Sequence, residues 1–216
     1  MPDFKYILFD LDGTLINSEA GVLRCIKLAL KEINQEDAPY STLRKMIGPP
    51  FRQSMKEFFG VEGQEIENLI KKYRTQYDID GWCDCKVYDG VMDMLKKLKE
   101  SGKTIALATS KPERFTQKIM DHFGFLPYFD FIGASLGDGT RDRKSLVISH
   151  VFLSLGIKDI DKAVMVGDTK YDIYGAKEAG IKSVGILWGF GDRAELEEAG
   201  ADYIANNPLD VLKLLV

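Results

Sequence analysis

Short apolar runs alternate with longer amphipathic stretches along most of the chain. The runs rich in apolar residues are Tyr6–Phe9, Ile105–Ala108, Phe129–Ile132, Ala163–Val166, Val184–Leu187 and Tyr203–Ala205. Strands of a parallel sheet are covered on both faces, so they are apolar throughout rather than alternating. These runs therefore predict the buried strands of a parallel sheet.

The amphipathic stretches between the runs predict helices that end at glycine. They are Val91–Ser101, Glu113–Phe123, Ser145–Leu155 and Asp172–Ala179, followed by Gly102, Gly124, Gly156 and Gly180. Glycine is common just beyond a helix because it adopts the left-handed conformation without strain. Strands that alternate with helices in this way predict an α/β fold with a doubly wound, Rossmann-like parallel sheet.

One connection is much longer than a crossover between parallel strands requires. Leu11 and Ile105 are 94 positions apart, and the helix predicted at Val91–Ser101 already supplies the crossover. We interpret residues 17–82 as an inserted, small all-helical cap domain, and residues 1–16 and 83–216 as the α/β core domain. Ser18 is placed to cap the first of four predicted cap helices, at 18–33, 41–47, 51–59 and 66–77.

Composition narrows the class of protein. The 216 residues are 45% hydrophobic and 29% charged, with a net charge of −4. These values exclude a disordered or collagen-like chain and argue against binding to nucleic acid. No apolar run approaches the roughly 20 residues of a membrane span, and the first residues do not resemble a signal peptide. Three sparse cysteines, Cys25, Cys83 and Cys85, indicate reduced thiols and a cytoplasmic location rather than a disulfide framework or a zinc site.

Polar residues follow three of the predicted strands. The segments are Asp10-Leu11-Asp12-Gly13-Thr14, Thr109-Ser110-Lys111, and Gly167-Asp168 with Asp172 four positions on. Ligands of open α/β sheets bind outside the carboxyl ends of the strands, so neighbouring strands would bring these residues to one crevice. Clustered carboxylates repel one another, and hard oxygen ligands suit Mg²⁺, which also neutralises a bound phosphate. A calcium loop starting at Asp10 is excluded, because Leu15 stands where that loop requires glycine.

These segments resemble motifs of the haloacid dehalogenase-like hydrolase superfamily. The similarity is greatest to the phosphoglycolate phosphatase and nucleotidase-like group, whose members carry a helical cap after the first strand, and it covers essentially the whole chain. Phe9–Leu15 matches the first motif, Thr109 the second, Lys144 the third and Gly167–Asp172 the fourth. The usual Lys-Pro pair of the third motif is here Lys144-Ser145, and Arg141, Arg143 or Lys111 could share the role of Lys144.

The resemblance implies roles for individual residues. Asp10 would be the nucleophile that forms an aspartyl-phosphate, and Asp12 the general acid and base. Thr109 and the Ser110 backbone N–H would bind phosphate oxygens, Lys144 would offset negative charge, and Gly13 would let the backbone turn beside the phosphate. Mg²⁺ would be held by the Asp10 carboxylate, the Asp12 backbone carbonyl and Asp168, with Asp172 as a ligand or as a residue that orients one.

Other polar and aromatic residues receive weaker assignments. Arg52, in a loop of the cap, is a candidate for binding a second anionic group of the substrate, although a solvated surface arginine is at least as good an interpretation. His122 and His150 are interpreted as structural or exposed residues, and Trp188 as a packing residue.

We therefore expect a Mg²⁺-dependent phosphomonoesterase that acts on a small soluble metabolite, with phosphoglycolate and nucleoside monophosphates as the leading candidates. A hexose phosphomutase resembling β-phosphoglucomutase, which returns the phosphoryl group to a sugar, is an alternative. A catalytically idle scaffold or binding protein is a third possibility, and the complete set of motif residues argues against it. We expect no nucleic-acid or membrane partner, and a monomer or weak dimer.

Overall fold

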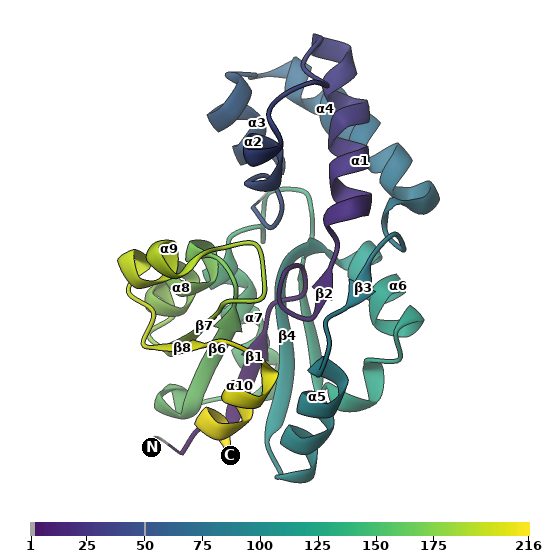
Figure 1. Ribbon diagram of the computed structural model, residues 1–216. Helices are drawn as coiled ribbons and strands as arrows, with labels where there is room; N and C mark the ends of the chain where they lie inside the picture. Colours follow the sequence, from purple (N-terminus) through teal and green to yellow (C-terminus); the bar gives the residue numbers. More distant parts are fainter. Residues whose placement is uncertain (1–2, 50) are drawn as a thin grey trace. The chain divides into compact units, whose positions relative to one another are not determined.

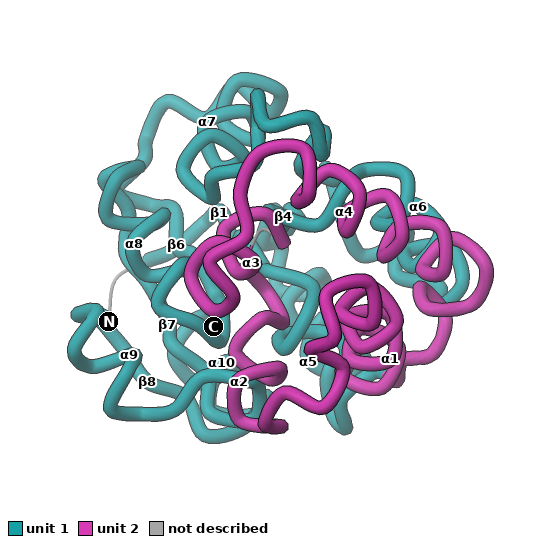
Figure 2. The backbone as a smooth tube through the Cα atoms, turned by 90° about the horizontal axis from the view of Figure 1, so that it is seen from above, with its two compact units in different colours: residues 1–16, 87–216 teal, residues 17–86 magenta. Residues whose placement is uncertain are grey.

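The computed structural model describes residues 3–49 and 51–216. The chain divides into two compact units (Figure 2), an α/β unit of Met1–Ile16 and Val87–Val216 and a helical unit of Asn17–Lys86. The second boundary lies four residues beyond the 82/83 boundary predicted from the sequence. The backbone N–H of Gly21 donates to the carbonyl oxygen of Asp84, which fastens the segment after position 82 to the helical unit.

A six-stranded sheet in the order β5-β4-β1-β6-β7-β8 forms the centre of the α/β unit. Its strands are β1 (Tyr6–Phe9), β4 (Thr104–Pro112), β5 (Phe131–Ser135), β6 (Ala163–Gly167), β7 (Lys182–Ile186) and β8 (Tyr203–Ala205). All neighbouring strands are parallel, and Tyr6 pairs with Thr104 on one side and with Ala163 on the other. The predicted α/β fold is confirmed, and β1 lies between the two strands that carry the other motifs.

Helices cover both faces of this sheet (Figure 1). They are α5 (Val91–Glu100), α6 (Glu113–His122), α7 (Lys144–Leu155), α8 (Lys170–Glu178), α9 (Arg193–Ala199) and α10 (Pro208–Leu215). Helices α7 and α8 lie on one face, and α5 and α10 pack together on the other (Figures 1 and 2). The doubly wound arrangement follows from strands that are apolar on both sides.

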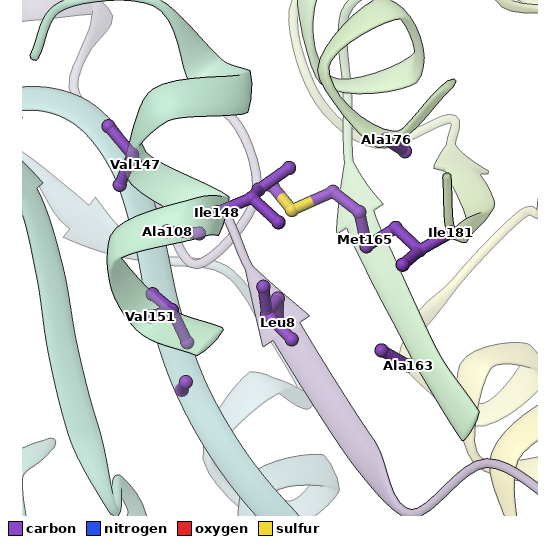
Figure 3. Close-up of a cluster of buried hydrophobic side chains, with 10 residues drawn as sticks. Leu8, Ala108, Val147, Ile148, Val151, Ala163, Met165, Ala176 and Ile181 are labelled. Atoms are coloured by element: carbon purple, nitrogen blue, oxygen red, sulfur yellow. The ribbon is translucent and has the colours of Figure 1, made fainter. Parts of the chain in front are cut away.

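The packing of α7 shows how the sheet positions a helix that carries a site residue. Val147, Ile148 and Val151 on this helix are fully buried against strand residues that include Leu8 and Met165 (Figure 3). Burial of each large aliphatic side chain contributes about 1.5–3 kcal/mol. Helix α7, whose first residue is Lys144, is thereby held against the sheet at β4 and β5.

The structure corrects the start of β5. The sequence pattern predicts a strand from Phe129, whereas β5 begins at Phe131 after a short 3₁₀ helix, η3 (Leu126–Tyr128). The Asp130 carboxylate accepts a hydrogen bond from the backbone N–H of Ile105 at 2.9 Å. The backbone N–H of Ile105 thus bonds to a side chain and not to a strand carbonyl, so the regular strand begins only after Asp130 and runs to Ser135.

The helical unit contains four α-helices among the described residues. They are α1 (Glu19–Leu30), α2 (Tyr40–Arg44), α3 (Phe51–Phe59) and α4 (Gln64–Gln76), with the 3₁₀ helix η1 (Lys31–Ile33) after α1 and the π-helical turn η2 (Tyr77–Gly81) after α4. Ser18 precedes α1, but its side chain makes no capping hydrogen bond. The Asn17 side chain instead accepts the N–H of Glu19 at 3.0 Å.

The chain passes between the units at two short strands, β2 (Ile16–Asn17) and β3 (Lys86–Val87), which form a separate two-stranded sheet. No helix in the described part of the chain is long and apolar enough to cross a membrane.

Candidate active site

The loop after β1 is a tight turn built around Gly13. The N–H of Gly13 donates to the carbonyl oxygen of Ile16, and the N–H of Leu15 donates to that of Leu11. Gly13 has φ of +81°, and a Cβ at this position would lie 2.0 Å from Oδ2 of Asp168. Glycine is therefore required both by the left-handed backbone and by the close approach of an acidic side chain. The structure shows why position 13 has no side chain: Asp168 occupies the adjacent space.

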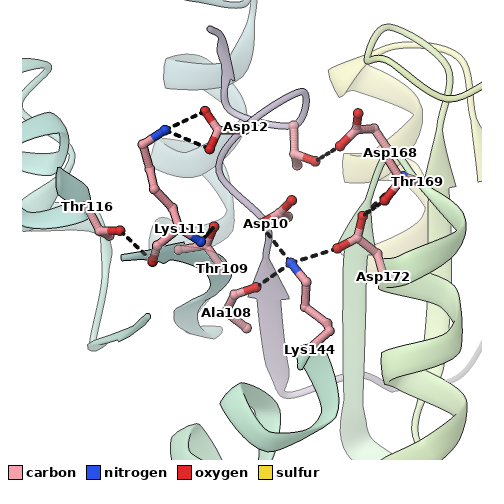
Figure 4. A network of polar contacts seen from close by, with 11 residues as sticks. Asp10, Asp12, Ala108, Thr109, Lys111, Thr116, Lys144, Asp168, Thr169 and Asp172 are labelled. Carbon is pink, nitrogen blue, oxygen red and sulfur yellow. Dashed lines mark hydrogen bonds and ion pairs between the residues drawn. The ribbon is translucent and has the colours of Figure 1, made fainter. Parts of the chain in front are cut away.

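Lys144 joins the first and fourth motifs. Its Nζ lies 2.8 Å from Oδ1 of Asp10 and 2.8 Å from Oδ1 of Asp172, and it donates a hydrogen bond of 2.9 Å to the carbonyl oxygen of Ala108 (Figure 4). Three acceptors match the three N–H donors of an ammonium group. Because Lys144 is the first residue of α7, the packing of that helix sets where its side chain begins.

The neighbouring arginines take other positions. Arg143 is exposed, and Arg141 donates its Nε–H to the carbonyl oxygen of Ala134 at 2.9 Å. Of the basic residues in this segment, Lys144 is the one whose ion pairs reach the carboxylates of the first and fourth motifs.

Asp168 is fully buried and is held through both of its oxygens. Thr14 donates its hydroxyl to Oδ1 at 3.0 Å, and the backbone N–H of Phe190 donates to Oδ2 at 2.8 Å. The loop after β7 is fastened to the same place, because the indole N–H of Trp188 donates to the carbonyl oxygen of Thr14 at 3.0 Å. Trp188 thus links two site loops through a hydrogen bond, a role beyond the packing predicted for it.

Sequence reasoning missed the contribution of this loop. A Cβ on Gly189 would lie 2.3 Å from Cβ of Asp168 and 2.4 Å from the carbonyl oxygen of Gly13. Glycines at positions 189 and 191, on either side of Phe190, indicated that other atoms pack closely against this backbone. They did not indicate that these atoms belong to Asp168 and Gly13.

Asp172 has two structural contacts besides its proximity to the cluster. Its Oδ2 accepts hydrogen bonds from the backbone N–H of Thr169 at 3.1 Å and from the Thr169 hydroxyl at 3.0 Å, which stabilises the start of α8. Its Oδ1 faces Lys144. These contacts fix the Asp172 side chain between Thr169 and Lys144, and its role as a metal ligand or as a residue that orients one stays a prediction.

Asp10, Asp168 and Asp172 each place a carboxylate oxygen within 4.8 Å of the others. Burial raises the pKa of Asp10 to about 6, against the opposing effect of Lys144 and with a further increase from Asp172. Burial, with the charges of Asp172 and Asp10, also raises the pKa of Asp168 well above its usual range. Burial alone would lower the pKa of Lys144, but its ion pairs with Asp10 and Asp172 raise it above the ordinary value.

Lys144 is therefore paired with two of three buried acidic groups, Asp10 and Asp172, and Asp168 has no basic partner among the described residues. The raised carboxyl pKa values show that this charge is incompletely compensated, and an additional cation with hard oxygen ligands would relieve the repulsion. The donor set thus fits a divalent metal ion of the Mg²⁺ type.

A second buried ion pair lies beside this cluster (Figure 4). Nζ of Lys111 is 2.9 Å from Oδ1 and 2.8 Å from Oδ2 of Asp12. The Thr109 hydroxyl is buried at the end of β4 and accepts the N–H of Lys111 at 3.2 Å, which leaves its own proton for another acceptor. Ser110 is half-buried between them. The sequence left the role of Lys111 open, and the structure places it against Asp12.

The remaining candidates lie elsewhere. Arg52 belongs to the helical unit, is about half exposed, and its guanidinium contacts both carboxylate oxygens of Glu67. Arg52 lies in α3 and not in the loop predicted from the sequence. Its predicted contact with substrate stays a prediction, and Pro50 of that predicted loop lies outside the described residues. His122 is exposed and His150 half-buried, and they contact the rings of Phe123 and Phe131, as expected of structural or exposed residues.

Comparisons with known proteins identify the family of the chain. The sequence pattern of haloacid dehalogenase-like hydrolases matches residues 7–186. The chain is 34% identical to a 5'-nucleotidase of Pseudomonas aeruginosa, covering 89% of this chain and 87% of that protein. It is 30% identical to a phosphoglycolate phosphatase of Aquifex aeolicus, with coverage of 98% and 96%.

Two further similarities complete the comparison. The tyrosine-protein kinase PtkA of Mycobacterium tuberculosis is 34% identical over 87% of this chain, which spans 63% of PtkA. A crystal structure described as a predicted phosphatase from Clostridium acetobutylicum superimposes with a TM-score of 0.94 at 38% identity, covering 98% of each chain. The resemblance stated from the motifs is confirmed, and the chain belongs to the haloacid dehalogenase-like hydrolases.

Proposed function

We propose that the protein is a Mg²⁺-dependent phosphatase that hydrolyses a small phosphorylated metabolite through an aspartyl-phosphate on Asp10. The observation that carries the proposal is the buried Asp10 carboxylate at the carboxyl end of β1, with Lys144 on one of its oxygens and two further carboxylates within reach. A nucleophile, a fixed positive charge and a candidate cation site meet at one end of the sheet, where α/β proteins bind ligands.

The metal ion would be held by Asp10, Asp168 and the Asp12 backbone carbonyl, with Asp172 as a further ligand or as a residue that orients one. When bound, Mg²⁺ supplies positive charge that offsets the phosphate oxygens and the clustered carboxylates. The hydrogen bonds that Asp168 accepts from Thr14 and Phe190 fix the direction of this carboxylate before any ligand arrives.

Asp10 attacks phosphorus in the first half of the reaction. A carboxyl pKa of about 6 leaves most of this group ionised at pH 7, as nucleophilic attack requires. The bond between Asp10 and phosphorus forms while the bond from phosphorus to the leaving oxygen breaks, and Asp12 donates a proton to that oxygen. Lys144 holds Oδ1 of Asp10 and so orients the carboxylate.

Water completes the cycle in the second half of the reaction. Asp12, now a carboxylate, takes a proton from a water molecule that attacks the aspartyl-phosphate and releases phosphate. The Thr109 hydroxyl, the Ser110 backbone N–H and Lys144 bind the phosphoryl oxygens in both halves, because charge develops on those oxygens in each transition state.

The relatives support a substrate resembling phosphoglycolate or a nucleoside monophosphate, since one is a phosphoglycolate phosphatase and another a 5'-nucleotidase. Arg52 is proposed to contact a second anionic group of such a substrate. The protein is proposed to act in the cytoplasm as a monomer or weak dimer.

The test is hydrolysis of 4-nitrophenyl phosphate with Mg²⁺, with EDTA, and by the Asp10→Asn variant. The matched control is Asp161→Asn, which makes the same change at an exposed aspartate. We expect EDTA and Asp10→Asn to abolish hydrolysis and the control to retain it. Hydrolysis that survives both treatments would contradict the mechanism.

A panel of phosphorylated metabolites then identifies the substrate. Conversion of a hexose 1-phosphate to the 6-phosphate, without release of phosphate, would replace the phosphatase assignment with a phosphomutase. Because PtkA is also similar, transfer of phosphate from ATP to a tyrosine peptide is measured in parallel, and transfer in place of hydrolysis would indicate a kinase. Absence of all three activities would support a binding protein.

A further inference from the structure

Lys111 and Asp12 form an ion pair that the proposed reaction does not account for. Both residues are buried, with 8% and 9% of their surfaces exposed, and the ammonium group contacts both carboxylate oxygens. Removing two charges from water is unfavourable, and apolar replacements of buried pairs are often neutral or stabilising. Stability is therefore a poor explanation for this pair, and its position beside Asp10 suggests a part in the chemistry.

The backbone of β4 is distorted where it presents Lys111. Thr109 pairs with Ala134, but the next pair is Pro112 with Ser135, so Ser110 and Lys111 have no counterparts on β5. Irregularities of this kind redirect a side chain and occur often beside active sites. In a regular strand, these two residues would remain in the ladder between Thr109 and Pro112.

Hydrogen bonds fix this distorted segment on both sides of Lys111. Its backbone N–H donates to the Thr109 hydroxyl at 3.2 Å, and its carbonyl oxygen accepts the Thr116 hydroxyl at 3.3 Å. Thr116 also donates to the carbonyl oxygen of Pro112 at 3.2 Å and is fully buried in α6. The backbone from which the Lys111 side chain extends is thus held in place by the protein itself.

The two lysines of the site divide its acidic groups between them (Figure 4). Lys144 contacts Asp10 and Asp172, whereas Lys111 contacts Asp12. Asp12 follows Asp10 by two residues in the same loop, yet its carboxylate turns to the end of β4. In the described part of the chain, the hydrogen bonds of the Asp12 carboxylate are the two from Lys111.

We propose that Lys111 is a positioning residue that orients the Asp12 carboxylate for proton exchange with the leaving oxygen and with water. The inference rests on the proposed function, in which Asp12 is the general acid and base. Lys111 acts through Asp12 and needs no contact with the reacting atoms. Without the ammonium group, the Asp12 side chain would sample other rotamers, and fewer turnovers would find it aligned.

The first experiment separates positioning from substrate binding. Lys111→Met removes the charge and retains much of the length. We expect kcat for phenyl phosphate to fall about 10- to 100-fold, with KM changed less than about threefold, because proton transfer by a positioned group contributes on the order of 10²–10⁴ in rate. Lys111→Arg, which preserves a charged contact with both oxygens, should recover part of kcat. The control Lys158→Met alters an exposed lysine and should match the wild type.

The second experiment asks whether Lys111 acts through Asp12. Adding Lys111→Met to Asp12→Asn should lower kcat little further than Asp12→Asn alone, since the group to be positioned is already absent. The loss of kcat/KM caused by Lys111→Met should also be smaller for 4-nitrophenyl phosphate than for phenyl phosphate, because kcat/KM reports the half of the reaction in which the ester oxygen leaves, and nitrophenolate is the better leaving group. A purely structural effect would lower both rates equally.

The outcomes are distinct. Multiplicative losses in the double variant, a rise in KM with kcat unchanged, or equal losses of kcat/KM for both esters would overturn the positioning role. If Lys111→Met does not fold, Lys111→Gln takes its place in the same comparisons, judged by the same criteria. Wild-type protein that hydrolyses neither ester would refute the proposed function itself, whereas Asp10-dependent hydrolysis indifferent to Lys111 would refute this inference alone.

Discussion

Both units of the protein have exposed ion pairs, but among the described residues only the α/β unit also buries some. The α/β unit buries its lysines 111 and 144 with Asp10, Asp12 and Asp172, and it buries Asp168 without a basic partner. The helical unit keeps the ion pairs of Arg24 with Asp80, Arg52 with Glu67, Lys56 with Glu62 and Lys72 with Glu32 largely in solvent. Similar residue types thus occupy two very different environments.

The buried charges are those of the candidate active site, whereas the exposed charges keep the surface solvated. Exposed ion pairs contribute little to stability because water and salt screen them. Buried charges oppose folding unless each is compensated, and the raised pKa values of Asp10 and Asp168 show that compensation is incomplete here. The α/β unit therefore retains an unfavourable cluster, as expected where a cation and a phosphate are to bind.

The largest expected effect comes from removing the buried cation that faces two carboxylates. Lys144→Met should lower the free energy of unfolding by about 3–5 kcal/mol, because removal of one partner leaves the others buried and uncompensated. Urea denaturation at pH 7 without divalent cations measures it. The exposed control Lys158→Met should unfold like the wild type, and an unchanged midpoint for Lys144→Met would contradict the comparison.

Removing a buried negative charge should have the opposite sign. Because the pKa of Asp168 is raised, its ionised form opposes folding at neutral pH. Asp168→Asn should raise the melting temperature of the metal-free protein by about 2–4 °C, on the order of 1 kcal/mol, while abolishing hydrolysis. Thermal melts with and without Mg²⁺ check this, and a variant less stable than the metal-free wild type would show that the charge is well compensated.

The pH dependence of metal binding follows from Asp10. Its pKa is 3.8 in the unfolded chain and about 6 in the folded protein, so the metal-free protein loses stability as pH rises from about 4 to 6. A cation that binds the carboxylate must displace the proton below pH 6. The apparent affinity for Mg²⁺ should therefore fall up to about tenfold for each pH unit below 6.

Mg²⁺-dependent shifts in melting temperature at pH 5, 6 and 7 measure this affinity. In Asp10→Asn, the part of the pH dependence that belongs to this carboxyl group should disappear. If the wild type reached half-saturation at the same Mg²⁺ concentration at pH 5 and at pH 7, protonation of Asp10 at pH 5 would be contradicted.

The smallest effect is expected in the helical unit. Arg52→Ala breaks the pair with Glu67, in which both side chains are about half exposed, and should leave the melting temperature unchanged. A drop of several degrees would show that exposed pairs matter more in this unit than we infer. The KM of Arg52→Ala for phosphoglycolate is the measurement that checks the predicted contact of Arg52 with a second anionic group.

The sequence predicted those parts of the site that depend on side-chain identity at the ends of strands. Asp10, Thr109 and Asp168 follow apolar runs, and the order of the strands brings them to adjacent positions in the sheet. Lys144 was chosen over its basic neighbours because it directly precedes a helical pattern, and the structure places it on Asp10.

The parts that escaped prediction depend on backbone groups or on contacts between distant loops. The N–H of Phe190 bonds to Asp168, but every residue other than proline has such a group, so the sequence carries no sign of it. The partner of Lys111 depends on the irregular end of β4, and irregular pairing has no periodic pattern. Ser18 was expected to cap α1, but Asn17 supplies the acceptor. Serine and asparagine both suit that role, so the sequence did not distinguish between these neighbours.

The position of β1 in the middle of the sheet has a consequence for the order in which activity is acquired. Tyr6 must find Thr104 and Ala163 before this strand is paired along both edges, and distant pairing of this kind slows folding. On the ribosome, Asp10 is synthesised before β4 and β6, the two strands that pair with β1. A nascent chain that ends before β6 would contain Asp10 but neither Asp168 nor Asp172, so the cluster of three carboxylates could not form.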